Sequence, residues 1–508
     1  MPKPHVRIES NAKWTNKHQN VSGPVASYYD VWNRWDDQSK DEIPWRPGIA
    51  GLQRAIRDAQ AASASVRAIG GSWSLSSAAY CPQFMVNTKP LNAFNIGLRA
   101  ESLLSNAVPF RGKLMFAQCG CTVQDVHDAL ATENLALTTS GASDGQTLGG
   151  AIATGTHGAA NQIGAMHDAV LGMHVLAENG EPYWIERASL PVVSDEFLSF
   201  IDTPVGNLRR NDDLFDAALV SIGSFGLVHA YLLEVEPIYT LETYLRRFDF
   251  QDIRHTLGTL DVTPLNLPRG SALPFHFEIT LNPYRTGPGE RGAYVRFMYK
   301  DPGSSPSPAP AGSDGHRPGD DLLGVIGTLS DIVPIAIPTL VSALMEKNLP
   351  ASEAVRATPG YTFGPTTIRG RGTSTEMGFR LSDIVAAIDI IMSVADDHPF
   401  GGVVAVRYVK GSRALLAFTQ YEPTCTVEIQ AVDSDRTAEA YRRIWSQLDA
   451  AGIAFTFHWG QALPFEPSRY RNVYGSRADR WLAAKGSFLS AAGRRLFSNE
   501  LVRGVGLE

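Results

Sequence analysis

Residues 144–158, with the sequence DGQTLGGAIATGTHG, constrain the fold of this chain more than any other segment. Glycine occupies five of these positions, so much of the backbone has no side chain to keep a ligand away from its N–H groups. The segment is too polar for a core helix, and its threonines add hydroxyls to the same surface. It predicts a loop that binds a large anion, the alternative being a tight glycine turn between two elements. The residues expected at the ligand are Thr147, Gly149, Gly150, Thr154, Gly155, Thr156, His157 and Gly158.

A second glycine turn lies upstream, within residues 65–76 (SVRAIGGSWSLS). The apolar run 66–69 predicts a strand, and a strand that ends in a glycine turn brings backbone N–H donors to a phosphate. Neither segment has the GxGxxG of nicotinamide-binding folds or the GK[ST] of a Walker loop, which disfavours NAD and ATP. The residues expected at the ligand are Arg67, Ile69, Gly70, Gly71, Ser72, Trp73 and Ser74.

The two segments together resemble the vanillyl-alcohol-oxidase-type (PCMH-type) FAD-binding fold, and in particular its aldonolactone and alditol oxidase branch. In that family a strand ends in R-A-x-G-x-G-H-S, and T-x-G-G-A-x-x-T-G-T-H-G follows later in the chain. Residues 67–70 and 147–158 are similar to these motifs, and the resemblance extends to 224–236, 458–460 and 497–499. It is weakest between 240 and 400. The resemblance implies FAD as the cofactor, with Gly226, Val228 and Asn499 near it.

Composition disfavours several other classes of protein. The net charge of −7 and the lack of a basic run in the sequence argue against a nucleic-acid partner. Cys119 and Cys121 are too close for a common disulfide and lack a second pair for zinc, so we expect reduced thiols and no metal site. The first residues contain no apolar signal segment, and Asp331 and two prolines interrupt the apolar stretch 322–345. This stretch predicts a buried or lid helix, with an interfacial membrane helix as the less favoured alternative, and no transmembrane segment. We therefore expect a cytoplasmic protein.

The chain is long enough for two domains, and its pattern predicts an α+β fold. We expect an N-terminal strap at 1–40, a two-part FAD-binding domain at 41–237, an antiparallel-sheet substrate (cap) domain at 238–463, and a C-terminal segment at 464–508 that returns to the FAD domain. The Pro/Gly/Ser-rich residues 301–321 predict a mobile insertion in the cap. Predicted helices are 49–62, 123–133, 382–395 and 434–451, and predicted strands include 275–281, 293–299, 376–381, 403–408 and 424–432.

Oxidation of an alcohol by a flavin needs a base for the hydroxyl proton and polar groups that stabilise charge at the flavin ring. The resemblance implies a Glu-x-Arg pair on one strand, a His-x-Thr pair on the next, and a Lys after His-Trp-Gly. This chain departs from that pattern, with Ala405-Val-Arg407, Glu428-Ile-Gln430 and Gln461 at these positions. Because side chains alternate along a strand, the departures suggest a carboxylate that has moved one strand over, from 405 to 428.

Glu428 is the leading candidate for the base, with Arg407 as its charge partner; the alternative for Glu428 is an ordinary solvated carboxylate on a strand. Glu376 is the second candidate, on a strand that lines the site in relatives. His458 either faces the flavin or is a structural histidine. Gln461 is expected to donate a neutral hydrogen bond where relatives place a cation, which stabilises a reduced anionic ring less and lowers the flavin potential.

Relatives often attach the flavin covalently to a histidine at the position that Trp73 fills here. An indole has no nucleophilic ring nitrogen comparable to that of imidazole, so we expect noncovalent FAD. Trp73 then lies beside the dimethylbenzene edge of the flavin or packs within its loop. His157 is expected to be a structural or ring-adjacent residue and not an attachment site.

The sequence therefore predicts an FAD-dependent oxidoreductase that oxidises the CH–OH group of a small molecule, such as an alcohol, a polyol, a sugar lactone or a bulkier apolar alcohol. Molecular oxygen is the expected acceptor. Two alternatives stay open: an FAD-binding protein of the same fold that has lost alcohol oxidation, and an oxidase acting on a C–N or activated C–C bond. The missing Glu, Lys and attachment His motivate the first alternative.

Overall fold

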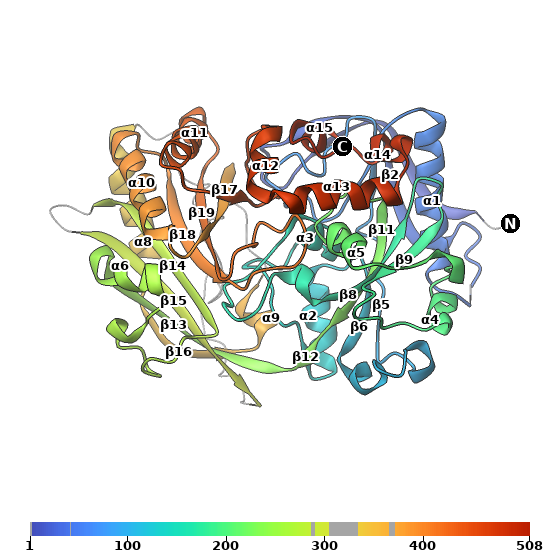
Figure 1. Ribbon diagram of the computed structural model, residues 1–508, viewed down its shortest axis with the longest axis horizontal. Coiled ribbons are helices and arrows are strands. Elements are labelled where there is room, and N and C mark those ends of the chain that lie inside the picture. Colours follow the sequence, from blue (N-terminus) through green and yellow to red (C-terminus); the bar gives the residue numbers. More distant parts are fainter. Residues whose placement is uncertain (1–2, 41, 286–289, 304–333, 365–370) are drawn as a thin grey trace.

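The computed structural model describes residues 3–40, 42–285, 290–303, 334–364 and 371–508. Two halves lie side by side along the long axis of the molecule (Figure 1). One half contains two β-sheets and both glycine-rich segments, and the other half contains a single large sheet. Both ends of the chain lie in the first half, so the second half is an excursion from it.

The first half holds a four-stranded and a six-stranded sheet, and β7 (Leu135–Ala136) and β12 (Glu236–Pro237) form a separate two-stranded sheet. The four-stranded sheet has the order β1 (Pro4–Thr15), β2 (Ser22–Trp35), β4 (Phe84–Asn87), β3 (Val66–Ile69). The six-stranded sheet has the order β10 (Leu208–Arg210), β9 (Pro182–Glu186), β8 (Val170–Leu176), β11 (Leu227–Glu234), β6 (Leu114–Gln118), β5 (Phe94–Ile96). Helix α1 (Arg46–Ala61) contacts strands of both sheets and fully buries Leu52, Ala55 and Ile56. This helical spacing of apolar residues joins the two sheets into one core.

Residues 4–35 form the β1–β2 hairpin, which corrects the expectation of a surface strap over 1–40. Strand β2 pairs with β4 in parallel, so the hairpin extends the sheet that leads into the first glycine turn. Val25, Tyr29 and Val31 are buried and share one face of the strand, because side chains alternate along it. The hairpin is therefore an integral part of the first half.

The second half is built on an eight-stranded antiparallel sheet. Its order is β16 (Ser352–Ala357), β13 (Tyr239–Asp249), β15 (Arg291–Pro302), β14 (His276–Arg285), β18 (Gly402–Val409), β19 (Thr424–Val432), β17 (Gly372–Arg380), β20 (Thr456–Phe457). Helices α6 (Phe250–Thr259), α8 (Ile337–Asn348), α10 (Ile384–Asp397) and α11 (Asp435–Ala450) lie on the outer side of the sheet, away from the first half (Figure 1).

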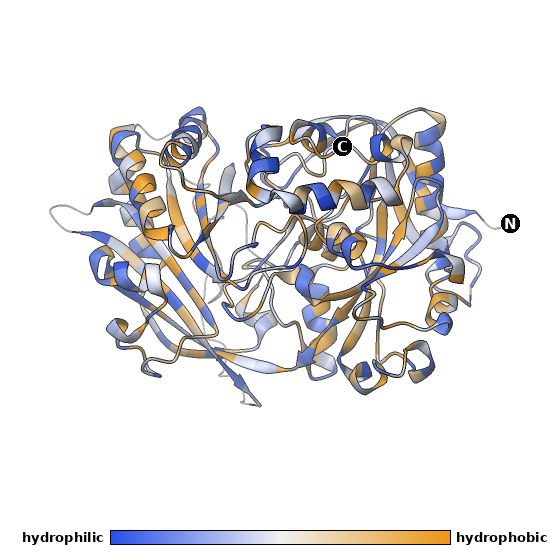
Figure 2. Ribbon diagram, viewed as in Figure 1, coloured by the Kyte–Doolittle hydropathy of each residue, from blue (hydrophilic) through white to orange (hydrophobic). Residues whose placement is uncertain are grey.

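Helix α10 shows why these helices cover the sheet. Ile384, Ile388 and Ile391 recur at helical spacing and are fully buried. The helix accordingly mixes hydrophobic and hydrophilic residues in Figure 2. The α+β class and the antiparallel cap sheet expected from the sequence are confirmed.

Four helices at the C-terminal end lie across the first half (Figure 1): α12 (Pro467–Tyr474), α13 (Ser476–Phe488), α14 (Ala491–Leu496) and α15 (Glu500–Gly504). Trp481 of α13 is fully buried, with its ring edge-on to Phe225 at 5.1 Å between centroids. Its Nε1 donates to the carbonyl oxygen of Val220 at 3.3 Å. The C-terminal segment thus packs on the core of the first half.

Shorter elements complete the chain. The remaining helices are α2 (Val123–Thr132), α3 (Leu148–Thr154), α4 (Asp195–Phe200), α5 (Asp212–Leu219) and α9 (Pro359–Thr362), and the remaining strands are β7 (Leu135–Ala136) and β12 (Glu236–Pro237). The 3₁₀ turns are η1 (Ala100–Ser102), η2 (Val108–Lys113), η3 (Met166–Ala169), η4 (Val205–Asn207), η5 (Thr263–Leu265) and η7 (Pro334–Ala336).

Residues 304–333 fall outside the described chain, and with them most of the predicted insertion 301–321 and the start of the apolar stretch 322–345. The end of that stretch forms α8, which packs on β14 and buries Val341 and Met345. Within the described ranges, no helix is long and apolar enough to cross a bilayer.

Candidate active site

A cavity opens between the two halves, where both glycine-rich segments meet residues of the large sheet. It holds about 1570 Å³ of empty space, which includes space open to solvent. The predicted site residues in its wall are Arg67, Ile69, Gly70, Gly71, Ser72, Trp73, Ser74, Thr147, Gly149, Gly150, Thr154, Thr156, His157, Gly226, Val228, Glu376, Arg407, Glu428, His458 and Gln461. Gly155, Gly158 and Asn499 do not line the cavity.

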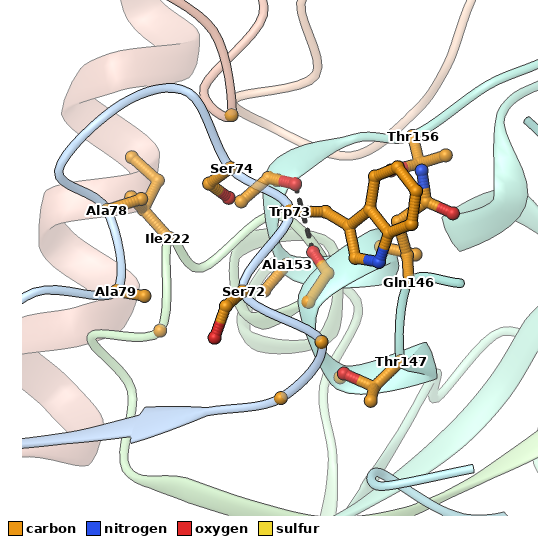
Figure 3. Close-up of a pocket in the computed structure, with 18 of the residues that line it drawn as sticks. Ser72, Trp73, Ser74, Ala78, Ala79, Gln146, Thr147, Ala153, Thr156 and Ile222 are labelled. Carbon is orange, nitrogen blue, oxygen red and sulfur yellow. Dashed lines mark hydrogen bonds between the residues drawn. The ribbon is translucent and has the colours of Figure 1, made fainter. Parts of the chain in front are cut away.

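The two glycine turns touch each other at one side of the cavity (Figure 3). A Cβ atom added to Gly70 would lie 1.8 Å from Thr147 Oγ1, and one added to Gly71 would lie 2.7 Å from the carbonyl oxygen of Gly145. Ser72 has a left-handed φ of 58°, which turns the chain after β3. Glycine is needed here because the two backbones approach too closely for any side chain.

Residues 148–154 of the second segment form helix α3, which corrects the expectation of a loop there, and the glycines of this segment have different tasks. Gly155 has a φ of 89° and ends helix α3, a conformation that L side chains rarely adopt. A Cβ on Gly158 would lie 2.6 Å from the carbonyl oxygen of Ser140. Gly150 differs, because a Cβ there would meet only Thr147 Oγ1, at 3.6 Å. Gly150 thus leaves open space in the cavity wall, whereas Gly155 and Gly158 shape the backbone behind it.

Trp73 lies inside the cavity between the two turns. Its indole lies beside Gln146 and Thr156 (Figure 3), and a Cβ on Gly145 would lie 2.5 Å from Trp73 Cζ2. Its Nε1 is buried and finds no hydrogen-bond partner in the part of the chain that the structure describes. The ring forms an aromatic part of the wall where the resemblance implies an attachment histidine.

Arg67 and Asn499 hold the loops around the cavity. The Arg67 guanidinium donates to the carbonyl oxygens of Gly223 at 2.8 Å and Ala78 at 2.5 Å. Burial lowers the pKa of Arg67 to about 10, so it stays charged near neutral pH. Asn499 Nδ2 donates to carbonyl oxygens in the turn 77–80 and caps α15. Asn499, expected near the cofactor, therefore lies outside the cavity wall and fastens a loop that lines it.

Charged side chains on five neighbouring strands of the large sheet form a polar row: Arg296 (β15), Glu278 (β14), Arg407 (β18), Glu428 (β19) and Glu376 (β17). Glu278 Oε1 lies 2.8 Å from Arg296 Nη1, and its Oε2 lies 2.7 Å from Arg407 Nε. Arg407 Nη1 lies 2.7 Å from Glu428 Oε2. All five side chains are buried, and buried charges of this kind persist only when they are paired.

Both oxygens of Glu428 are occupied by donors. Its Oε1 accepts from Ser374 Oγ at 3.0 Å and from Gln461 Nε2 at 2.9 Å. Its Oε2 accepts from Gln430 Nε2 at 2.9 Å and from Arg407 Nη1 at 2.7 Å. A carboxylate has about four acceptor directions, so these contacts leave little room for a further donor. Glu428 therefore acts first as the centre that fixes Arg407 and Gln461.

Glu376 stands directly opposite Glu428 in the β17–β19 register, where like charges repel. Arg407 Nη1, 3.5 Å from Glu376 Oε1, and His157 Nε2, 2.9 Å from the same oxygen, offset this repulsion. Burial disfavours the charged carboxylate, but His157, His458 and Arg407 outweigh it and lower the pKa of Glu376 to about 2. Glu376 Oε2 accepts no hydrogen bond from the described residues, so an ionised oxygen is free to act.

His458 lies beside this pair. The backbone N–H of Gly460 donates to His458 Nδ1 at 3.0 Å, which leaves the proton of the neutral ring on Nε2. Burial lowers the pKa of His458 to about 4, so the ring is neutral near pH 7. Phe418 packs on both His458 and His157, with centroids 5.0 and 5.1 Å apart. In this tautomer His458 is a hydrogen-bond donor and not a base.

Comparison with known families identifies the ligand of the two turns. Residues 49–186 match a family model described as an FAD binding domain, a span that contains both glycine turns and Trp73. This chain therefore contains an FAD-binding domain. FAD is its cofactor.

The flavoprotein shares its fold with cholesterol oxidase. A crystal structure of cholesterol oxidase from B. sterolicum matches with a TM-score of 0.69 at 12% identity, over 98% of this chain and 97% of that one. The His121Ala mutant of cholesterol oxidase from Brevibacterium sterolicum matches with a TM-score of 0.68 at 12% identity, over 99% of both chains.

In sequence, the flavoprotein is similar to fungal D-arabinono-1,4-lactone oxidases. The protein of Yarrowia lipolytica is 23% identical over 255 residues, 48% of this chain and 41% of that protein. The protein of Candida albicans is 22% identical over 218 residues, 42% of this chain and 35% of that protein. The match thus spans less than half of the length of either relative.

The cavity of the flavoprotein suits FAD. Thr147 Oγ1, Gln146 Oε1 and Trp73 Nε1 are buried without partners among the described residues, and buried polar atoms normally have one. The open side of Gly150 lets a ligand approach the backbone of the second turn. The residues that would hold FAD are therefore the turn 70–74 and residues 147–150 at the start of helix α3, with Trp73 as an aromatic wall.

Three features in and around the cavity were not anticipated. The loop 221–223, with left-handed φ angles at Ile222 and Gly223, lines the cavity just before strand β11. Glu278 joins the polar row, and His18 reaches the cavity from the N-terminal hairpin. Only the Gly223 turn had a sequence signal, a glycine between two apolar runs; Glu278 and His18 are isolated in sequence from the other site residues.

Proposed function

We propose that this flavoprotein oxidises the CH–OH group of an uncharged small molecule to C=O, with noncovalently held FAD and molecular oxygen as the final acceptor. The observation that carries the proposal is that Arg407 and Glu376 share one cavity wall with the FAD-binding turns. Bound FAD supplies the acceptor for the hydride that leaves the substrate carbon. The lactone and cholesterol oxidases that the chain resembles are named for oxidations, which supports this reaction class.

Glu376 accepts the hydroxyl proton in this proposal, ahead of Glu428. Its Oε2 is free, whereas both oxygens of Glu428 already accept two donors each. A carboxylate with a pKa of about 2 is a weak base toward an alcohol. The transfer becomes favourable as the C=O bond forms, because the hydroxyl of a carbonyl-like carbon is strongly acidic. The His157 ring, whose Nε2 lies 2.9 Å from Glu376 Oε1, holds this carboxyl group in place during the transfer.

The polar row favours an uncharged substrate. Arg296 pairs with Glu278, and Arg407 pairs with Glu278 and Glu428. Glu376 pairs with His157. A substrate carboxylate would have to displace one of these buried partners, which costs the energy of an unpaired buried charge. Hydroxyl groups need only hydrogen bonds. An alcohol, polyol or lactone therefore fits this wall better than a hydroxy acid.

The proposal places this protein in the cytoplasm. The four cysteines, Cys81, Cys119, Cys121 and Cys425, are buried free thiols. Free thiols persist in reducing compartments.

The test is anaerobic addition of neutral alcohols, polyols, lactones and amines to the purified holoprotein, followed by flavin absorbance. Bleaching by a CH–OH compound, with colour restored by air, is expected. Bleaching by amines alone would favour C–N oxidation, and no bleaching by any compound would favour an FAD-binding protein without alcohol chemistry.

A further inference from the structure

The turn of the N-terminal hairpin, residues 16–21, is fastened to the first FAD-binding loop. Asn16 Nδ2, Lys17 N and Asn20 Nδ2 donate to carbonyl oxygens within residues 72–75, at 2.9, 2.9 and 2.8 Å. These bonds use backbone groups and the two asparagines. None of these three bonds involves the imidazole of His18 at the tip of the turn.

His18 points into the molecule, with only 2% of its surface exposed, although its neighbours Lys17 and Gln19 are exposed. Its ring stands edge-on to Trp73, with centroids 5.9 Å apart and planes at 72°. It lines the FAD cavity together with Glu428. The hairpin thus carries an imidazole from the start of the chain to the polar wall formed by the distant sheet.

One ring nitrogen of His18 is an unused acceptor. Nδ1 is buried and has no hydrogen-bond partner within the described ranges. Burial lowers the pKa of His18 to about 4, against the opposite effects of the Trp73 backbone and Glu428, so the ring is neutral near pH 7. The neutral ring carries one N–H and one lone pair, and the unpartnered Nδ1 is the nitrogen left for a ligand.

Gln461 presents a second unused acceptor in the same cavity. The carboxylate of Glu428 can only accept, so Gln461 turns its amide nitrogen toward it at 2.9 Å. Its Oε1 is buried and lacks a partner among the residues that the structure describes. A molecule that satisfies both His18 and Gln461 must therefore bring O–H or N–H donors.

We propose that His18 is a substrate-positioning residue, whose Nδ1 accepts a hydrogen bond from a hydroxyl of the substrate while Gln461 Oε1 accepts from a second hydroxyl. This inference rests on the proposed oxidation of a CH–OH compound. It adds that recognition depends on hydroxyls beyond the one that is oxidised. A polyhydroxylated substrate satisfies both acceptors, and a simple alcohol satisfies neither while its own hydroxyl faces Glu376.

The test compares three variants of the holoprotein. His18→Phe keeps a ring against Trp73 and removes the acceptor, and His18→Asn restores a side-chain oxygen near the position of Nδ1. Gln19→Asn is the matched control, because Gln19 is exposed in the same turn and its left-handed φ of 59° suits asparagine. FAD content and the dissociation constant for FAD are measured first. Anaerobic flavin reduction is then followed against the concentration of glycerol, sorbitol, glucono-1,5-lactone and 1-butanol.

His18→Phe is expected to raise the half-saturating concentration of polyol or lactone about tenfold, the equivalent of one hydrogen bond. The limiting rate of reduction should change less than threefold, His18→Asn should recover most of the affinity, and Gln19→Asn should match the parent. An equal half-saturating concentration in His18→Phe and the parent would overturn this inference and leave the proposed function standing. A loss of FAD affinity with unchanged saturation would assign His18 to the cofactor and also overturn it. If no compound reduces the parent, the proposed function fails with it.

Discussion

At the scale of single residues, the two facing carboxylates of the site differ in what surrounds them. Four donors hold Glu428, whereas Glu376 keeps Oε2 free beside His157. Glu376→Gln should therefore slow flavin reduction about 10²-fold or more, the range for losing a general base, and leave FAD content unchanged. Glu428→Gln should mainly weaken substrate binding, since it loosens Arg407. Anaerobic stopped-flow reduction of both variants is the measurement.

A larger loss of rate in Glu428→Gln than in Glu376→Gln would restore Glu428 as the base that the sequence indicated. The pH profile gives a second check. Because the pKa of Glu376 is lowered to about 2, it stays ionised through the whole range from pH 8 to 5, and reduction should not lose rate there through this residue.

Two glycines of helix α3, Gly150 within it and Gly155 at its C-cap, make a matched pair. Gly150→Val fills open space in the cavity, so it should abolish FAD retention while the apoprotein unfolds near the parental temperature. Gly155→Val places a β-branched residue where the backbone φ is 89°, which strains the backbone, so it should lower the unfolding temperature of the apoprotein as well. Gly112→Val, where no atom lies within 4 Å of the added Cβ, is the control. Flavin content and thermal unfolding are measured; full flavin in Gly150→Val would show that FAD lies elsewhere.

At the scale of elements, helix α13 carries a buried cation. Lys485 is fully buried, and its Nζ donates to the carbonyl oxygen of Leu507 at 2.8 Å. Burial lowers the pKa of Lys485 to about 7, below the 10.5 of the unfolded chain. Between these values the unfolded chain holds the proton more tightly, so the cost of burying Lys485 shrinks as pH rises from 7 to about 10.

Lys485→Met removes this titration while keeping an unbranched side chain of similar length. The unfolding temperature of the parent should therefore rise relative to that of Lys485→Met as pH increases from 6.5 to 9.5. Thermal unfolding of the two holoproteins side by side is the measurement. Comparing the difference cancels the other groups that titrate in this range. A difference that stays flat with pH would mean that Lys485 keeps its proton when folded.

At the scale of the whole molecule, the cofactor cavity joins the two halves. The turns come from the first half and the polar row from the second, so bound FAD should stabilise their association. Acid precipitation should release all flavin to the supernatant, because Trp73 offers no attachment nitrogen. The apoprotein should unfold at a lower temperature than the holoprotein. Added FAD should restore the temperature of the holoprotein, because FAD at 100 times its dissociation constant stabilises the folded state by about 2.7 kcal/mol. Flavin that stays with the precipitate would contradict noncovalent binding.

Local patterns in the sequence determined much of this protein. The first glycine turn, the strand before it and the helices 49–62 and 434–451 follow from composition and periodicity within short windows. The alternation along strands also indicated that a carboxylate at 428 takes the place of the one missing at 405. In the β18–β19 register, Ala405 and Glu428 lie opposite each other.

Only the tertiary structure decided which distant side chains share the cavity. Glu376 and Glu428 are 52 positions apart, yet the β17–β19 register makes them face each other. His18 enters because the hairpin pairs with β4 and its turn binds the loop 72–75. Strand pairing and turn docking depend on contacts between segments far apart in the chain, and no local window of sequence contains them.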